Sequence, residues 1–174
     1  MTHTNRALLF ISIVLVVIAA LFSYFILRVH SDSGGETFAK EYGLELSNYE
    51  GKPVHLFDYR RKVLIAYAWA SWCPYCAAEL KNLAQLKKTY GDDIQIVAIN
   101  RGEPLPVAKA FTDGLQGIGG LILLIDPADS FFKEIGGYAM PETIFIDVGG
   151  TITLHQRGPI QLPEVDEKIK ELLK

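Results

Sequence analysis

The feature that most constrains this chain is a pair of cysteines, Cys73 and Cys76, separated by two residues. They are the only cysteines among 174 residues. An apolar run of strand character at 62–70 precedes the pair, and apolar side chains at helical spacing follow it. The pattern predicts a strand over 62–70 and a helix over 74–90, with the two thiols at the junction between them.

This junction predicts a reactive thiol. We expect Cys73 to be the N-cap and Pro74 the first helical residue, where its missing N–H costs nothing. The positive end of the helix dipole would then face the Cys73 sulfur and favour its thiolate. Cys73 is therefore the predicted nucleophile. Cys76 lies one turn further along and is the predicted resolving thiol, more shielded than its partner.

Structural uses of the two cysteines fit the sequence less well. A zinc site with four thiolates is excluded by their number, and a Cys₂His₂ site needs two downstream histidines, whereas only His155 follows. A structural disulfide across two residues closes a loop too small to constrain the unfolded chain much. The sequence therefore favours a redox-active dithiol.

The first part of the chain predicts a membrane anchor. Residues 7–27 form a run of 21 without a charge, bounded by Arg6 and Arg28. At about 1.5 Å per residue, a helix of this length spans ~30 Å of hydrocarbon. A cleaved signal peptide is the alternative, but the run exceeds the usual core of about 7–15 residues and lacks a small-x-small cleavage site. We expect residues 7–27 to be a single-pass anchor, with residues 1–6 in the cytoplasm and the domain on the other side of the membrane.

The rest of the chain predicts a tether and one domain. Residues 28–43 are the expected tether with a first helical turn, and 44–174 the expected domain. The net charge of −3 and the lack of a basic patch argue against nucleic acid as a partner. A further buried strand at 94–100 predicts a parallel strand–helix–strand crossover. The other expected elements are strands near 44–46, 54–58, 121–125, 143–147 and 152–156, and helices near 106–115, 130–135 and 162–173.

Three features outside the cysteines carry a family resemblance. Trp72 precedes the first cysteine, Glu79 follows the second by three residues, and Met140 and Pro141 lead into a buried strand. From about residue 44 to 174, the chain resembles the thioredoxin superfamily, and within it the membrane-anchored TlpA/ResA-type oxidoreductases of bacterial envelopes. The resemblance implies an α/β fold, a thioredoxin-like central mixed β-sheet flanked by helices, here preceded by the N-terminal transmembrane helix.

The resemblance also implies a substrate surface. Pro141 matches the family's cis-proline, which lies against the dithiol, and the backbone of Met140 would pair with an extended substrate segment. An ordinary turn proline is the alternative. Trp72, Pro74 and Tyr75 are the other residues expected to contact the substrate.

Glu79 is the predicted proton carrier. It matches an acidic residue that the subgroup keeps near its cysteines, and its spacing from Cys76 places both on one helix face. A solvated surface carboxylate is the alternative. Thioredoxin itself has a buried Asp where this chain has Tyr67, so Glu79 is the remaining candidate.

The predicted function is a membrane-tethered thiol-disulfide oxidoreductase that reduces protein disulfides outside the cytoplasm, with apocytochrome c-like clients and a membrane electron donor. No cofactor beyond the Cys73–Cys76 disulfide, and no metal, is expected.

Glutaredoxins share the dipeptide Pro74-Tyr75, so a disulfide donor is an alternative. A copper-binding chaperone using His155 is another, although such relatives space their cysteines by three residues. A peroxidase is disfavoured because the Thr of its Thr-x-x-Cys pattern is replaced by Ala70.

Overall fold

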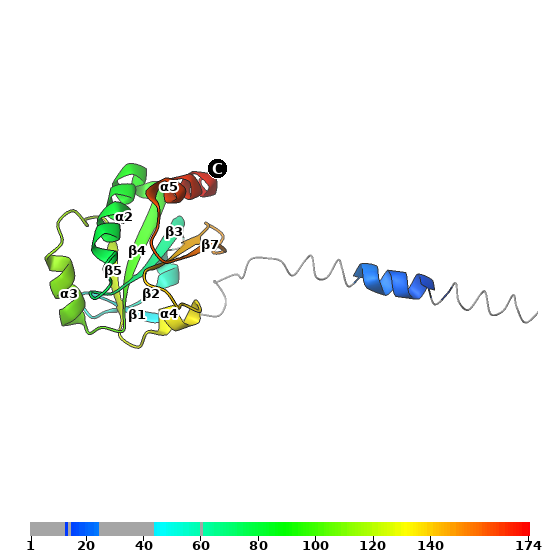
Figure 1. Cartoon of the computed structure of the whole chain (residues 1–174), viewed down its shortest axis with the longest axis horizontal. Helices are drawn as coiled ribbons and strands as arrows, with labels where there is room; N and C mark the ends of the chain where they lie inside the picture. The colour runs from blue at the N-terminus through cyan, green and yellow to red at the C-terminus, as the bar shows by residue number, and fades with distance from the viewer. Residues whose placement is uncertain (1–12, 14, 25–43, 60) are drawn as a thin grey trace, which may run out of the picture. The chain divides into compact units, whose positions relative to one another are not determined.

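The computed structural model describes residues 13, 15–24, 44–59 and 61–174, and the chain divides into two units, Met1–Gly35 and Glu36–Lys174 (Figure 1). In the first unit, residues 13 and 15–24 are helical. No helix within the described residues is long and apolar enough to cross a membrane. The predicted anchor at 7–27 extends beyond the described residues at both ends, and the predicted tether at 28–43 lies outside the described residues.

The second unit contains a mixed seven-stranded sheet in the order β2-β1-β5-β4-β3-β6-β7. The central strand β3 runs parallel to β4 and antiparallel to β6, and β4 runs parallel to β5. The predicted thioredoxin-like mixed sheet and the parallel crossover are therefore confirmed. The strands are β1 (Glu45–Asn48), β2 (Pro53–His55), β3 (Val63–Trp69), β4 (Ile94–Arg101), β5 (Ile122–Asp126), β6 (Glu142–Ile146) and β7 (Ile152–Arg157).

Helices flank both faces of this sheet (Figure 1). Alternation along β3 sends Tyr67 and Trp69 to one face and Ala66 and Ala68 to the other. The first face packs against side chains of α2, α3 and α5, and the second against those of η1 and α4. The helices are α2 (Cys76–Tyr90), α3 (Leu105–Asp113), α4 (Ser130–Glu134) and α5 (Leu162–Leu172), with short 3₁₀ helices η1 (Leu56–Tyr59) and η2 (Gly91–Asp93).

One predicted strand is shorter than expected. The segment predicted as a strand over 54–58 leaves the sheet after His55 and continues as η1. The Asp58 carboxylate accepts the backbone N–H of His55 at 3.2 Å. His55, which is opposite Glu45, is thus the last residue of the ladder, and a local side-chain acceptor takes its N–H as the chain turns into η1.

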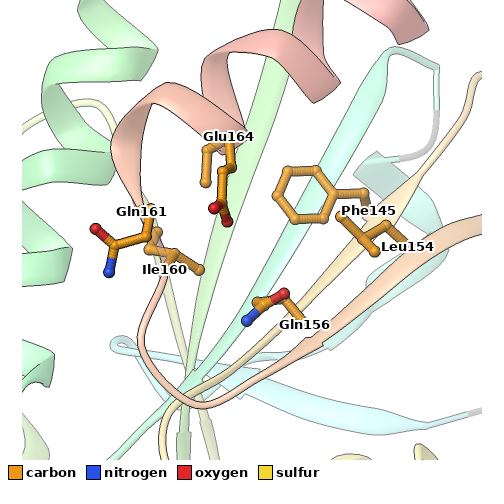
Figure 2. Close-up of a pocket in the computed structure, with 7 residues that line it drawn as sticks. Phe145, Leu154, Gln156, Ile160, Gln161 and Glu164 are labelled. Atoms are coloured by element: carbon orange, nitrogen blue, oxygen red, sulfur yellow. The ribbon is translucent and has the colours of Figure 1, made fainter.

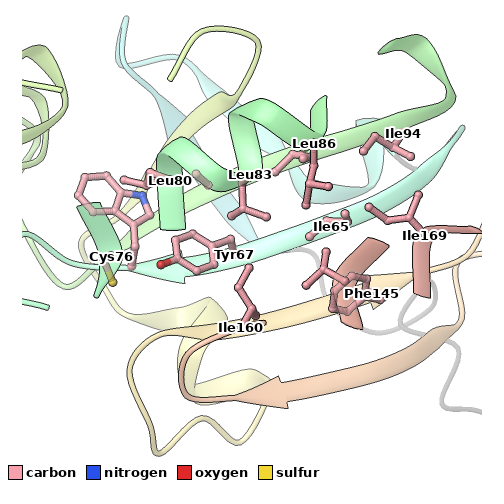
Figure 3. Packing of buried hydrophobic residues seen from close by; sticks show 14 of the residues in the cluster. Ile65, Tyr67, Cys76, Leu80, Leu83, Leu86, Ile94, Phe145, Ile160 and Ile169 are labelled. Atoms are coloured by element: carbon pink, nitrogen blue, oxygen red, sulfur yellow. The ribbon is translucent and has the colours of Figure 1, made fainter. Parts of the chain in front are cut away.

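The dithiol is part of the core on the α2 side of the sheet. Figure 3 shows Cys76 at one end of a row of apolar side chains, with Leu80, Leu83 and Leu86 of α2 lying over β3. All three leucines are buried. Burying a leucine side chain stabilises a fold by about 1.5–3 kcal/mol, so this row fixes α2, and with it the cysteines, against the sheet.

Candidate active site

The two cysteines form a buried disulfide. The S–S distance is 2.19 Å and the Cα atoms lie 5.5 Å apart. Cys73 is 3% exposed and Cys76 is fully buried. The expected order of shielding is therefore present, with only a small difference between the two residues.

The start of α2 differs from the prediction. The helix begins at Cys76, and its N-cap is Tyr75, so Cys73 is not the N-cap and Pro74 is not the first helical residue. The Cys76 N–H donates to the Cys73 carbonyl at 3.3 Å, which is a turn bond between residues i and i+3. Tyr75 has φ −92° and ψ −22°, typical of the third residue of a type I turn, whose second position favours Pro. The helix N-terminus therefore lies at the second sulfur.

Glu79 is buried among the residues of the core rather than solvated. Its exposed fraction is 4%, so the surface-carboxylate alternative is wrong. Oε1 accepts the backbone N–H of Ile160 at 2.8 Å, and Oε2 has no hydrogen-bond partner among the described residues. Burial raises the pKa of Glu79, and the bond from Ile160 opposes that rise. One oxygen is thus fixed while the other is available for a proton.

Tyr67 lies next to this carboxyl. Its side chain is fully buried, and Figure 3 shows its hydroxyl directed toward the end of the core where Cys76 lies. Burial, reinforced by the negative charge of Glu79, raises the pKa of Tyr67. Neither the hydroxyl nor Glu79 Oε2 completes a hydrogen bond within the part of the chain that the structure covers. Tyr67 therefore stays neutral beside a carboxyl that is itself easier to protonate.

The predicted cis peptide bond between Met140 and Pro141 is present. Pro141 is buried, and Met140 is half-buried against the same core cluster that contains both cysteines. The other predicted substrate-binding residues are exposed: Trp72 by 62%, Tyr75 by 55%, and Pro74 as well. These side chains are accessible to a partner molecule.

Trp69, the last residue of β3, is fully buried, and its ring stacks on Phe111 with centroids 5.3 Å apart.

A second carboxylate, which sequence reasoning did not single out, holds the segment before Cys73. Glu103 follows β4 and accepts the Ser71 N–H at 2.8 Å and the Ser71 hydroxyl at 2.6 Å. Asn100 donates its side-chain amide to the same carboxylate at 2.6 Å. Burial acts to raise the pKa of Glu103, but these hydrogen bonds outweigh it and leave the pKa lowered. Glu103 is therefore an ionised anchor for the turn that precedes Cys73.

A third carboxylate, Glu142, comes directly after Pro141 and was also missed. It is fully buried, and its Oε1 accepts the N–H groups of Tyr138 at 2.7 Å and Ala139 at 2.8 Å. Its Oε2 lies 2.7 Å from His155 Nε2. An acidic residue opening an otherwise apolar strand was the available signal, because a buried carboxylate needs donors.

His155 is thus a hydrogen-bonded histidine of the sheet. The described residues contain no group of three or more side chains suited to holding a metal ion.

A small hollow lies between β7 and α5 (Figure 2). Its volume is about 20 Å³, which is enough for about one water molecule. Ile160, whose N–H holds Glu79, forms part of its wall together with Phe145 and Leu154. The hollow is too small for a peptide segment.

A buried Cys-x-x-Cys disulfide at the start of a helix, beside a cis-proline loop on this sheet, defines a thioredoxin-fold thiol-disulfide oxidoreductase. The chain belongs to the redoxin family, whose model matches residues 33–169. The predicted superfamily and enzyme class are therefore confirmed.

The relatives agree with this assignment. The thiol-disulfide oxidoreductase ResA of Geobacillus thermodenitrificans is 27% identical over 130 residues, covering 73% of this chain and 72% of that protein. The thiol:disulfide interchange protein DsbE of Vibrio cholerae is 27% identical over 179 residues, covering 97% and 94%. The exposed lipoprotein thioredoxin Etrx1 of Streptococcus pneumoniae superposes with a TM-score of 0.66 at 28% identity, covering 74% and 98%.

Proposed function

We propose that this protein is a membrane-tethered oxidoreductase that reduces protein disulfides outside the cytoplasm. The observation that carries the proposal is the Cys73–Cys76 pair, which is buried in the core but flanked by the exposed side chains of Trp72 and Tyr75. These exposed side chains, adjacent to the cysteines in the chain, give a partner protein a surface to contact. The relatives named ResA and DsbE support the same type of activity.

The reaction transfers two electrons from this dithiol to a substrate disulfide. The Cys73 thiolate attacks one substrate sulfur, and the other substrate sulfur leaves as a thiolate, which takes up a proton. The Cys76 thiolate then attacks the Cys73 sulfur of the mixed disulfide and displaces the second substrate thiolate. The substrate ends as a dithiol and the enzyme as the Cys73–Cys76 disulfide. A membrane electron donor must then reduce that disulfide.

Glu79 would handle the proton of the resolving step. It follows Cys76 by three residues on α2, its Oε2 is unpartnered among the described residues, and burial raises its pKa. A carboxyl that is protonated more readily than usual can exchange a proton with a nearby thiol without solvent access. The neutral Tyr67 beside it does not compete for that proton.

The substrate would bind as an extended segment along Met140. An added strand of this kind gains affinity from main-chain hydrogen bonds, while side-chain contacts select the sequence. Trp72, Pro74, Tyr75 and Pro141 would provide those contacts around the sulfurs. Apocytochrome c-like proteins are the client class we propose.

The location we propose follows from residues 7–27 acting as a single-pass anchor. The apolar side chains described there, including Leu15, Val16 and Phe22, are exposed, which suits a helix surrounded by lipid. Residues 1–6 would lie in the cytoplasm and the redoxin domain outside it.

The Cys76→Ser variant tests the mechanism. Without the resolving thiol, the mixed disulfide between Cys73 and the client should accumulate as a covalent complex on non-reducing gels from the native host. The Cys73→Ser variant is the matched control and should trap nothing. A Cys76→Ser protein that stays monomeric would contradict the proposed reaction, and mass spectrometry of the trapped band would identify the client.

The opposite direction of electron flow is the second candidate, favoured by the Pro74-Tyr75 dipeptide between the cysteines. A disulfide donor for folding proteins would use the same residues in reverse. The reduction potential separates the two directions. We expect a value near that of thioredoxin, about −270 mV, whereas a value near about −120 mV would identify an oxidant.

A further inference from the structure

The loop before the cis-proline is held by a single buried carboxylate. Two successive backbone N–H groups, those of Tyr138 and Ala139, donate to Oε1 of Glu142 at 2.7 and 2.8 Å. These residues immediately precede Met140, the residue whose backbone is proposed to bind the substrate. Glu142 lies at the start of β6, so the loop is tied to the strand that follows it.

The carboxylate is in turn held from the neighbouring strand. His155 Nε2 lies 2.7 Å from Glu142 Oε2, and the side chains are 16% and 0% exposed. In the antiparallel ladder of β6 and β7, Glu142 is opposite Arg157 and His155 is opposite Ile144. Glu142 and His155 are therefore diagonal neighbours on one face of the sheet, and the ladder fixes their separation.

Two further contacts tie the same loop to the end of β7. The Gly158 N–H donates to the Pro141 carbonyl at 2.8 Å. The Arg157 guanidinium lies over the ring of Tyr138, 5.1 Å from its centroid. Tyr138 is itself 79% exposed, so core packing of its side chain does not fix its backbone. The Glu142 carboxylate supplies that restraint.

We propose that Glu142, oriented by His155, is a positioning residue for substrate binding: it fixes the backbone of Tyr138 and Ala139 so that Met140 presents a preformed edge to an extended peptide. This inference rests on the proposed function, because only there does Met140 pair with a substrate. Glu142 makes no contact with the sulfurs in this arrangement. A preformed edge improves affinity because less of the chain has to be ordered when the peptide binds.

Amide hydrogen exchange on the full chain in detergent micelles tests the restraint itself. In Glu142→Ala, the Tyr138 and Ala139 amides should exchange at least about tenfold faster, because they lose their acceptor. Glu142→Gln keeps one oxygen acceptor and should stay near the wild type. Glu134→Ala, which removes an exposed carboxylate from the adjacent α4, is the matched control. Unchanged exchange at the two amides in a folded Glu142→Ala would overturn the proposal.

Kinetics on the same variants test the consequence for binding. For a disulfide-bonded peptide, Glu142→Ala should raise KM about tenfold and leave kcat within about twofold. Reduction of the Cys73–Cys76 disulfide by dithiothreitol, which needs no peptide edge, should also stay within about twofold. If the peptide and dithiothreitol reactions fall by the same factor, Glu142 acts only on general stability and the proposal is wrong.

His155→Leu provides a second variant if Glu142→Ala does not fold. It removes the partner of Oε2 and should raise the same KM by a smaller factor, while His155→Gln, which can still donate to Oε2, should restore it. Equal KM values in His155→Leu and wild type would contradict the orienting role of His155. If the wild-type chain turns over no disulfide peptide, the proposed function fails, and the exchange measurements still decide whether Glu142 holds the loop.

Discussion

The carboxylates of α2 and β6 are both buried near the dithiol, yet their surroundings differ. Glu79 accepts one hydrogen bond, from Ile160, and its second oxygen has no partner within the described residues. Glu142 accepts two backbone N–H groups and is paired with His155. Burial alone therefore does not define a proton carrier. The carboxyl with an unpartnered oxygen can exchange a proton, whereas the carboxyl whose two oxygens both have partners is a structural anchor.

The largest expected effect that separates these two residues is on stability. Glu142→Ala leaves two N–H groups and one imidazole without their acceptor, and each unsatisfied buried group costs about 1–3 kcal/mol. We expect the free energy of unfolding to fall by about 3 kcal/mol. Glu79→Ala leaves only the Ile160 N–H unpaired and should cost roughly 1 kcal/mol on the same scale.

Urea denaturation of both variants at one pH measures this difference. Glu134→Ala again serves as the surface control and should lie within about 0.5 kcal/mol of the wild type. Equal losses in Glu142→Ala and Glu79→Ala would remove the distinction between anchor and proton carrier.

The sequence predicted the parts of this molecule that depend on local patterns. Apolar runs and turn residues located most strands and the crossover, and the match of Pro141 to the cis-proline of the resembling family predicted the cis bond. The start of α2 was misplaced because Pro74 suits both the first turn of a helix and the second position of a type I turn. Which one forms depends on the partner of the Cys76 N–H, and no local pattern specifies that.

The roles of Glu79 and Glu103 could not be predicted because partners that hold them are distant in the chain. The Ile160 N–H that holds Glu79 lies 81 residues away, and Ser71 is 32 residues from Glu103. Only Glu79 had a spacing from a cysteine that suggested a role. The backbone partners of Glu142 are local, at three and four residues, but its pairing with His155 forms only when β6 and β7 pair.

The smaller expected effect is the pH dependence of stability contributed by Glu79. Burial raises its native pKa above the ordinary value of 4.5, so the folded protein holds this proton more tightly than the unfolded chain. The stability from that proton is fully present below about pH 4.5 and is lost as pH rises through the native pKa.

Glu79→Gln keeps an acceptor for Ile160 but cannot ionise. Relative to the wild type it should become more stable as pH rises across this window, and the difference should then level off. Urea titrations between about pH 4 and 8 measure it. A stability difference between wild type and Glu79→Gln that stays flat with pH would mean that Glu79 holds no extra proton in the fold, and its role in resolving the mixed disulfide would have to be given up.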